Sequence, residues 1–170
     1  MPTPTYSQIF TTTVTGSATT QIEFGLIPAT YSDLVMVCKI VPNNAGAAYL
    51  NLRVGTGNSI DTGGNYSAQQ LVYTNGSVSA YQYFNDTNFE IVGNQYQTLG
   101  TFQLQIDING YTSTAAWKTV FARVSASDNA SRQNLGPWKN TAALNIIRLS
   151  SSSAAIGVGS TASLYGILRA

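Results

Sequence analysis

The chain has 170 residues, of which 44% are apolar and only 9% are charged; it contains no histidine and one cysteine, and its formal net charge is +1. The lack of histidine excludes a Ser-His-Asp hydrolase and the commonest metal sites, and a single thiol excludes a disulfide within the chain. The basic residues are scattered singly and form no positive stripe, so we expect one non-enzymatic domain over residues 1–170 with no cofactor, no metal and no nucleic-acid partner.

The first fifteen residues are rich in threonine and begin Met-Pro-Thr-Pro-Thr-Tyr. They have neither the basic start nor the apolar stretch of a secretory signal, and no apolar run in the chain approaches the ~18 residues of a membrane span. We therefore expect synthesis in the cytoplasm without a signal peptide, and no contact with a membrane. We also expect residues 1–15 to form a short N-terminal arm that is free to reach a neighbouring molecule.

The run at residues 34–40 is apolar on both of its faces. Such a run predicts a central strand that is covered by a layer on each side. Cys38 lies within it, and we interpret this cysteine as a small buried hydrophobic residue.

Three later segments, 48–54, 101–108 and 118–124, alternate apolar and polar residues, which predicts strands with one buried and one wet face. Their expected inward residues are Leu50, Leu52 and Val54 in the first, Phe102, Leu104, Ile106 and Ile108 in the second, and Val120, Ala122 and Val124 in the third. Further strands are expected at 8–14, 19–24, 70–74, 77–83, 88–92, 142–149 and 162–168.

Two Asn-Gly pairs punctuate these strands. Asn75-Gly76 predicts a tight type I′ hairpin, because both central residues of that turn need positive φ. Asn109-Gly110 is followed by Tyr-Thr-Ser-Thr, which favours a longer loop.

No window sustains apolar residues at helical spacing for three turns. Many short strands separated by Gly and Asn turns predict an all-β fold in which two sheets share one core. We expect an antiparallel β-sandwich of the jelly-roll type with about eight to ten strands, since no Cys-Trp-Cys pattern supports an immunoglobulin domain.

The remaining catalytic groups are carboxylates. Two of them flanking a sugar could hydrolyse a glycosidic bond, but sequence spacing does not bring any two together. The segment from Asn85 to Glu90 gathers oxygen ligands that could hold Ca²⁺, yet it lacks the spacing and the glycine of an EF-hand. We favour a turn that opens a strand.

Aromatic residues gather among Asn and Gln in one third of the chain. These residues are typical of a surface that stacks against carbohydrate or contacts another protein, although tyrosines could equally cap the core. We assign Trp117 and Trp138 mostly to packing. The candidate interface or ligand surface is Tyr73, Tyr81, Tyr83, Phe84 and Tyr96.

The C-terminus runs Gly159-Ser160-Thr-Ala-Ser-Leu164-Tyr165-Gly166-Ile167, in which a Gly-Ser step leads into a strand. Gly166 would weaken an isolated strand, but it permits a close backbone approach or a bulge. Three other motifs precede it in order: Ile27-Pro-Ala-Thr-Tyr-Ser-Asp-Leu34, Tyr49-Leu-Asn-Leu-Arg-Val54 ahead of Gly64-Asn-Tyr-Ser67, and Trp138 before Ala143-Leu-Asn-Ile-Ile-Arg-Leu149. On these motifs the chain resembles, from about residue 20 to 168, a jelly-roll domain family of tailed-phage virion proteins.

The resemblance implies a non-catalytic structural module that assembles as a homo-oligomer, with a trimer favoured. Its partners would be the major capsid protein or another virion protein, and its location the virion. Decoration or cementing of the capsid is the expected role within this family, since the chain has no fibrous repeat or coiled-coil stalk. The alternative is a receptor- or carbohydrate-binding module of a tail or head fibre, which would present coplanar tyrosine rings in a groove to a host glycan.

Overall fold

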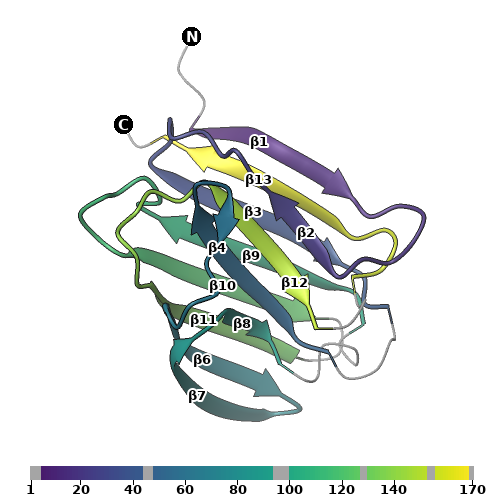
Figure 1. Ribbon diagram of the computed structural model, residues 1–170. Helices are drawn as coiled ribbons and strands as arrows, with labels where there is room; N and C mark the ends of the chain where they lie inside the picture. The colour runs from purple at the N-terminus through teal and green to yellow at the C-terminus, as the bar shows by residue number, and fades with distance from the viewer. Residues whose placement is uncertain (1–4, 44–47, 94–99, 127–129, 153–155, 169–170) are drawn as a thin grey trace.

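The computed structural model describes residues 5–43, 48–93, 100–126, 130–152 and 156–168. In these ranges the protein has thirteen strands and no helix, and two antiparallel sheets face each other (Figure 1). The predicted antiparallel β-sandwich is therefore confirmed. The described part of the chain also holds no helix that could span a membrane.

The two sheets differ in width. In the large sheet the order of strands is β1 (Tyr6–Thr13), β13 (Thr161–Ile167), β3 (Asp33–Ile40), β9 (Phe102–Asn109), β10 (Lys118–Ala126), β11 (Ala130–Trp138), β6 (Tyr66–Thr74) and β7 (Ser77–Asp86). In the small sheet it is β2 (Gln21–Phe24), β12 (Ile146–Ser151), β4 (Leu50–Thr56) and β5 (Ser59–Ile60), and β8 (Phe89–Val92) also pairs with β4.

Eight strands have the connectivity of a jelly roll. Half of the large sheet reads β1-β13-β3-β9 and the small sheet reads β2-β12-β4-β8, and the chain crosses between sheets at every step except from β4 to β8. We call these eight the jelly-roll strands. The others, β5, β6, β7, β10 and β11, are added strands, and four of them extend the large sheet beyond β9. They account for the excess over the expected eight to ten.

One hydrophobic core lies between the sheets. The alternation predicted for 48–54, 101–108 and 118–124 is confirmed, and so is the burial of Cys38, whose pKa is raised to about 12 by that burial. The core side chains of the large sheet include Leu34, Met36, Ile40, Leu104, Ile106, Ile108, Val120, Ala122 and Val124, and those of the small sheet include Ile22, Phe24, Leu50, Leu52, Val54, Ile147 and Leu149.

Two expectations for the first 40 residues are wrong. β3 is central, as predicted, but no second layer covers all of its outer face, because Val37 is 43% exposed and Lys39 faces solvent. The expected free arm is a paired strand from Tyr6 onward, since β1 hydrogen-bonds to β13 from Tyr6 to Thr13. The first four residues of that arm lie outside the described residues.

Both turn predictions are confirmed. Asn75 and Gly76 have φ values of 50° and 80° and join β6 to β7 in a tight hairpin. After Asn109 the chain makes a longer loop before β10 begins at Lys118. The strand that the sequence pattern missed entirely, apart from the two-residue β5, is β11.

Two tyrosines close one end of the core. The Tyr111 hydroxyl donates a hydrogen bond to the carbonyl of Pro28 and accepts one from the amide of Tyr31 at 3.3 Å, which ties the loop before β3 to the loop after β9. The Tyr31 ring in turn lies over Gly166, where an added Cβ would come within 2.2 Å of its Cγ. The predicted close approach at Gly166 is thus made by an aromatic ring.

The end of β11 is held by a set of polar contacts around Trp138, which is fully buried. The Asp61 carboxylate accepts hydrogen bonds from Trp138 Nε1 at 2.7 Å, from Asn65 Nδ2 at 2.9 Å and from the amide of Gly63 at 2.8 Å. On the same ring, Lys118 Nζ lies 5.6 Å from the centroid and donates to the carbonyl of Ser113 at 2.6 Å. These contacts fix β11 against the start of β6.

We expect Gly166→Ala to lower the free energy of unfolding by about 1–3 kcal/mol, because the new methyl group overlaps the Tyr31 ring. Urea denaturation measures the change. Gly25→Ala is the matched control, since its Cβ would meet only Ile146 Cδ1 at 3.9 Å, and it should stay within about 0.5 kcal/mol of the parent. Adding Tyr31→Ala should remove most of the penalty; an unchanged penalty would show that the ring is not its cause.

Acid should weaken the Asp61 contacts. Burial alone would raise the pKa of Asp61, but the hydrogen bonds from Trp138, Gly63 and Asn65 together hold that pKa below its usual value. Because the pKa of Asp61 is lower in the folded state, its carboxylate stabilises the fold at pH values above the unfolded-state pKa of about 3.9. This stabilisation is lost as the pH falls through the lower folded-state pKa.

We therefore expect Asp61→Asn to lose about 1–2 kcal/mol at pH 7 and to lose less stability than the parent between pH 5 and pH 3. Urea denaturation at several pH values gives both quantities. Parallel pH curves for the two proteins would contradict this assignment.

Candidate functional site

The outermost added strands, β6 and β7, reach past the edge of the small sheet (Figure 1), and the inner face of the large sheet borders solvent there. The inward-facing residues that pair across the large sheet change from apolar to polar between β9 and β7. One inward-facing row runs from β9 to β7 as Ile106, Ala122, Asn134, Gln70 and Tyr81. The apolar core therefore passes into a polar surface within a single row.

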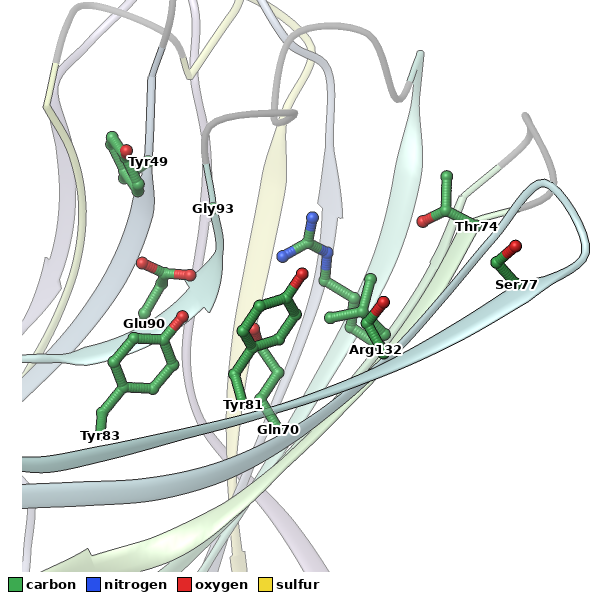
Figure 2. A pocket seen from close by; sticks show the side chains of 11 residues that line it. Tyr49, Gln70, Thr74, Ser77, Tyr81, Tyr83, Glu90, Gly93 and Arg132 are labelled. Atoms are coloured by element: carbon green, nitrogen blue, oxygen red, sulfur yellow. The ribbon is translucent and has the colours of Figure 1, made fainter.

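A cleft of about 470 Å³ lies over this polar surface. One wall is the inner face of β6, β7 and β11, and the other is the edge of the small sheet at β8 and the residue before β4. Figure 2 shows Tyr81 and Tyr83 side by side on β7, with the Glu90 carboxylate and the Arg132 guanidinium pointing into the space above them. The lining is Tyr49, Gln70, Val72, Thr74, Ser77, Ser79, Tyr81, Tyr83, Glu90, Gly93 and Arg132.

Glu90 and Arg132 are the charged groups among the described residues that line the cleft. Burial raises the pKa of Glu90; the charge of Arg132 and a hydrogen bond from the Tyr83 hydroxyl oppose that rise, and the charge of Asp86 adds to it. Gly93 leaves room beside both groups, because an added Cβ would lie 2.9 Å from Glu90 Oε1 and 3.4 Å from Arg132 Nη1. The cleft thus offers one strong acceptor and one strong donor close together.

A buried polar chain supports the floor of the cleft. Gln70 Nε2 donates to Asn134 Oδ1 at 2.5 Å, and Asn134 Nδ2 donates to the carbonyl of Ile91 at 3.2 Å. These bonds join β6 and β11 to β8 across the gap between the sheets. They fix the spacing of the two walls, since a satisfied buried network holds its members in one geometry.

The opposite, outer face of the same strands carries large exposed apolar side chains. Leu71 and Leu135 are 53% and 49% exposed, and Phe84, Trp117, Pro137 and Lys139 line a groove beside them. The outward residues of β6, β7 and β11 include no charged side chain. We call this surface the outer strip: Leu71, Tyr73, Val78, Phe84, Trp117 and Leu135.

The structure divides the predicted aromatic cluster. Tyr81 and Tyr83 line the cleft, whereas Tyr73 and Phe84 project from the outer face of the same sheet. Tyr96 lies outside the described residues. Two of the five predicted residues, Tyr81 and Tyr83, therefore lie in the cleft, and two lie on the other face of the sheet.

Sequence reasoning missed several residues of both surfaces. Tyr49, Gln70 and Arg132 of the cleft lie in segments far apart in the chain, and only the pairing of strands brings them together. Trp117, which we had assigned to packing, is 54% exposed, while the same assignment for Trp138 is confirmed.

The segment from Asn85 to Glu90 comprises the end of β7, a bend at Thr87 and Asn88, and the start of β8. Asn85 has a φ of 54°, and the Asp86 carboxylate accepts a hydrogen bond from the amide of Thr87 at 2.6 Å. Two cationic side chains already contact this segment, because Lys139 Nζ binds Asn85 Oδ1 and Arg53 Nε donates to the carbonyl of Thr87 at 3.0 Å. The described residues contain no cluster of three acidic or thiol ligands for a metal ion.

The C-terminal motif belongs to the jelly-roll strands and not to either surface. Ser160 is buried and its hydroxyl accepts a hydrogen bond from the amide of Val41 at 2.9 Å. Gly159 takes a positive φ of 86° just before β13, whose Leu164 side chain lies in the core. Tyr165, Gly166 and Ile167 complete the strand between β1 and β3.

Comparison with known proteins adds no functional assignment. The sequence matches no protein-family model and no curated protein. The features of the molecule that bear on its function are therefore the cleft, the outer strip and the jelly-roll connectivity that positions them.

Proposed function

We propose that this protein is a non-catalytic structural component of a tailed-phage particle, which decorates or cements the capsid as a homo-oligomer. The observation that carries the proposal is the outer strip, a sheet face with large apolar residues and no charges on β6, β7 and β11. Contiguous exposed apolar surface of this kind is typical of a protein contact. The resemblance of the sequence motifs to virion jelly-roll proteins supports the same role.

The residue types of the outer strip fit a protein interface. Aromatic residues are enriched and charged residues depleted at the centres of such interfaces, and the strip provides Tyr73, Phe84 and Trp117. Arg123 and Asp107 are joined at 3.0 Å, and Lys139, which lines the groove beside Phe84 and Trp117, binds Asn85 Oδ1. Burying the strip would therefore leave no unpaired charge on β6, β7 or β11.

Low net charge favours contact between identical chains. At +1 the chain has little electrostatic repulsion toward its copies. We propose a trimer in which the strip packs against a neighbouring copy or the major capsid protein, so that the particle gains stability from the added interface. The protein would then be located in the virion.

We expect Leu71→Arg and Leu135→Arg each to weaken self-association by about a hundredfold or more, because a buried unpaired guanidinium costs about 3–5 kcal/mol. Analytical ultracentrifugation of the parent should give a trimer and that of the variants a monomer. Val37→Arg is the matched control, because it places the same side chain on the outer face of the same sheet but outside the strip.

Location is tested by immunogold labelling of phage particles with antibodies raised against the purified chain. Labelling of the capsid surface would support decoration, and labelling of the tail would move the role to a tail attachment. A parent protein that remains monomeric at high concentration and labels no particle would overturn the proposal.

A further inference from the structure

Beyond this structural role, we infer that the cleft between β7 and β8 is a binding site for a neutral saccharide that offers vicinal hydroxyl groups. The inference rests on the geometry of the cleft and on its polar lining. It does not depend on the outer strip, which lies on the opposite face of the sheet.

The cleft presents aromatic rings to an occupant. Tyr81 and Tyr83 are successive inward-facing residues of β7, and Tyr49 lies on the opposite wall (Figure 2). Tyr81 is 48% exposed, so its ring is available to a ligand. Sugar rings have apolar C–H faces that pack on aromatic rings, while the tyrosine hydroxyls stay free to hydrogen-bond at the rim.

The polar groups match the hydroxyl pairs of a sugar. A sugar hydroxyl both donates and accepts, so one of two adjacent hydroxyls can donate to the Glu90 carboxylate while the other accepts from the Arg132 guanidinium. Gly93 borders both groups, and an added Cβ there would crowd the Glu90 carboxylate. Hydrogen bonds to ionised groups are stronger than those between neutral groups, so Glu90 and Arg132 would each give a neutral sugar one strong hydrogen bond.

The charge balance favours a neutral ligand over an acidic one. Among the described lining residues one carboxylate, Glu90, faces one guanidinium, Arg132, and the two influence each other's ionisation. A sugar acid or a phosphate would bring its own negative charge beside Glu90. Sites for such anions normally collect several cationic or amide donors around the charged group.

The size and support of the cleft fit a small ligand. Its volume of about 470 Å³ lies within the roughly 300–1,000 Å³ range of small-molecule sites and suits a mono- or disaccharide. The hydrogen bonds from Gln70 to Asn134 and from Asn134 to Ile91 hold the walls apart before any ligand arrives. A preformed site loses less affinity to ordering.

The test is calorimetric titration with matched sugars: glucose, galactose and their β-1,4-linked disaccharides against glucuronic and galacturonic acid. Saturation-transfer NMR covers millimolar affinities. We expect at least one neutral sugar to bind and its matched acid to bind at least about tenfold more weakly, since every 1.4 kcal/mol is tenfold. No binding of any neutral sugar, or tighter binding of the acids, would overturn the inference.

Variants locate the binding. Tyr81→Ala and Glu90→Gln should each weaken binding of the sugar by about tenfold or more, and Gly93→Ala should do so by displacing the Glu90 carboxylate. Tyr73→Ala is the matched control, because Tyr73 is 44% exposed on the paired strand but projects from the opposite face. Equal loss in Tyr73→Ala would overturn the assignment to the cleft.

Two controls separate loss of the sugar site from unfolding and from loss of the proposed interface. Circular dichroism and urea denaturation of each variant establish that the fold is retained. Leu71→Arg, which disrupts the outer strip, should leave sugar affinity unchanged, so failure of the structural proposal and failure of the sugar site give different results.

Discussion

The unequal width of the two sheets is the constraint on which the rest of this structure depends. Strands lie about 4.8 Å apart, so each strand added to the large sheet beyond the edge of the small one leaves a further inward row uncovered. Inward residues that the small sheet covers must be apolar or hydrogen-bonded, because a buried polar group without a partner is costly. Inward residues beyond the small sheet face water and are best polar. The cross-strand row from Ile106 to Tyr81 meets both requirements, because it changes from apolar to polar where the small sheet ends.

The hydrophobic core and the two candidate surfaces consequently lie on largely different strands. The jelly-roll strands hold most of the hydrophobic core, and their ends are closed by contacts such as those of Tyr111. The added strands β6, β7 and β11 carry the cleft on one face and the outer strip on the other. Asn134 joins the two parts, since its side-chain amide donates a hydrogen bond to the carbonyl of Ile91 on β8.

The sequence predicts best where both layers are present. Alternation at 101–108 is clear because every inward residue of β9 meets the core. Burial alternates just as regularly along β11. Its inward residues include Arg132, Asn134 and Gly136, however, so the sequence of this strand does not alternate between apolar and polar residues. The jelly-roll strands are therefore visible in the sequence, while the strand that carries Arg132 of the cleft is not.

The site is harder to predict than the fold for a second reason. Odd and even positions of a strand face opposite sides, so Tyr81 and Tyr83 share a face that excludes Phe84. That parity can be read from the sequence. Which side is the cleft depends on the pairing between β6 and β11, in which Gln70 and Asn134 lie 64 residues apart. The link between Glu90 and Arg132 depends on the same long-range register.

The hairpin of β6 and β7 hydrogen-bonds to the rest of the sheet only through one side of β6, and β7 is the terminal strand there. Changes at its outermost residues leave the central packing untouched. Substitutions on the exposed faces of this hairpin can thus alter both candidate surfaces while the strands beneath keep their packing.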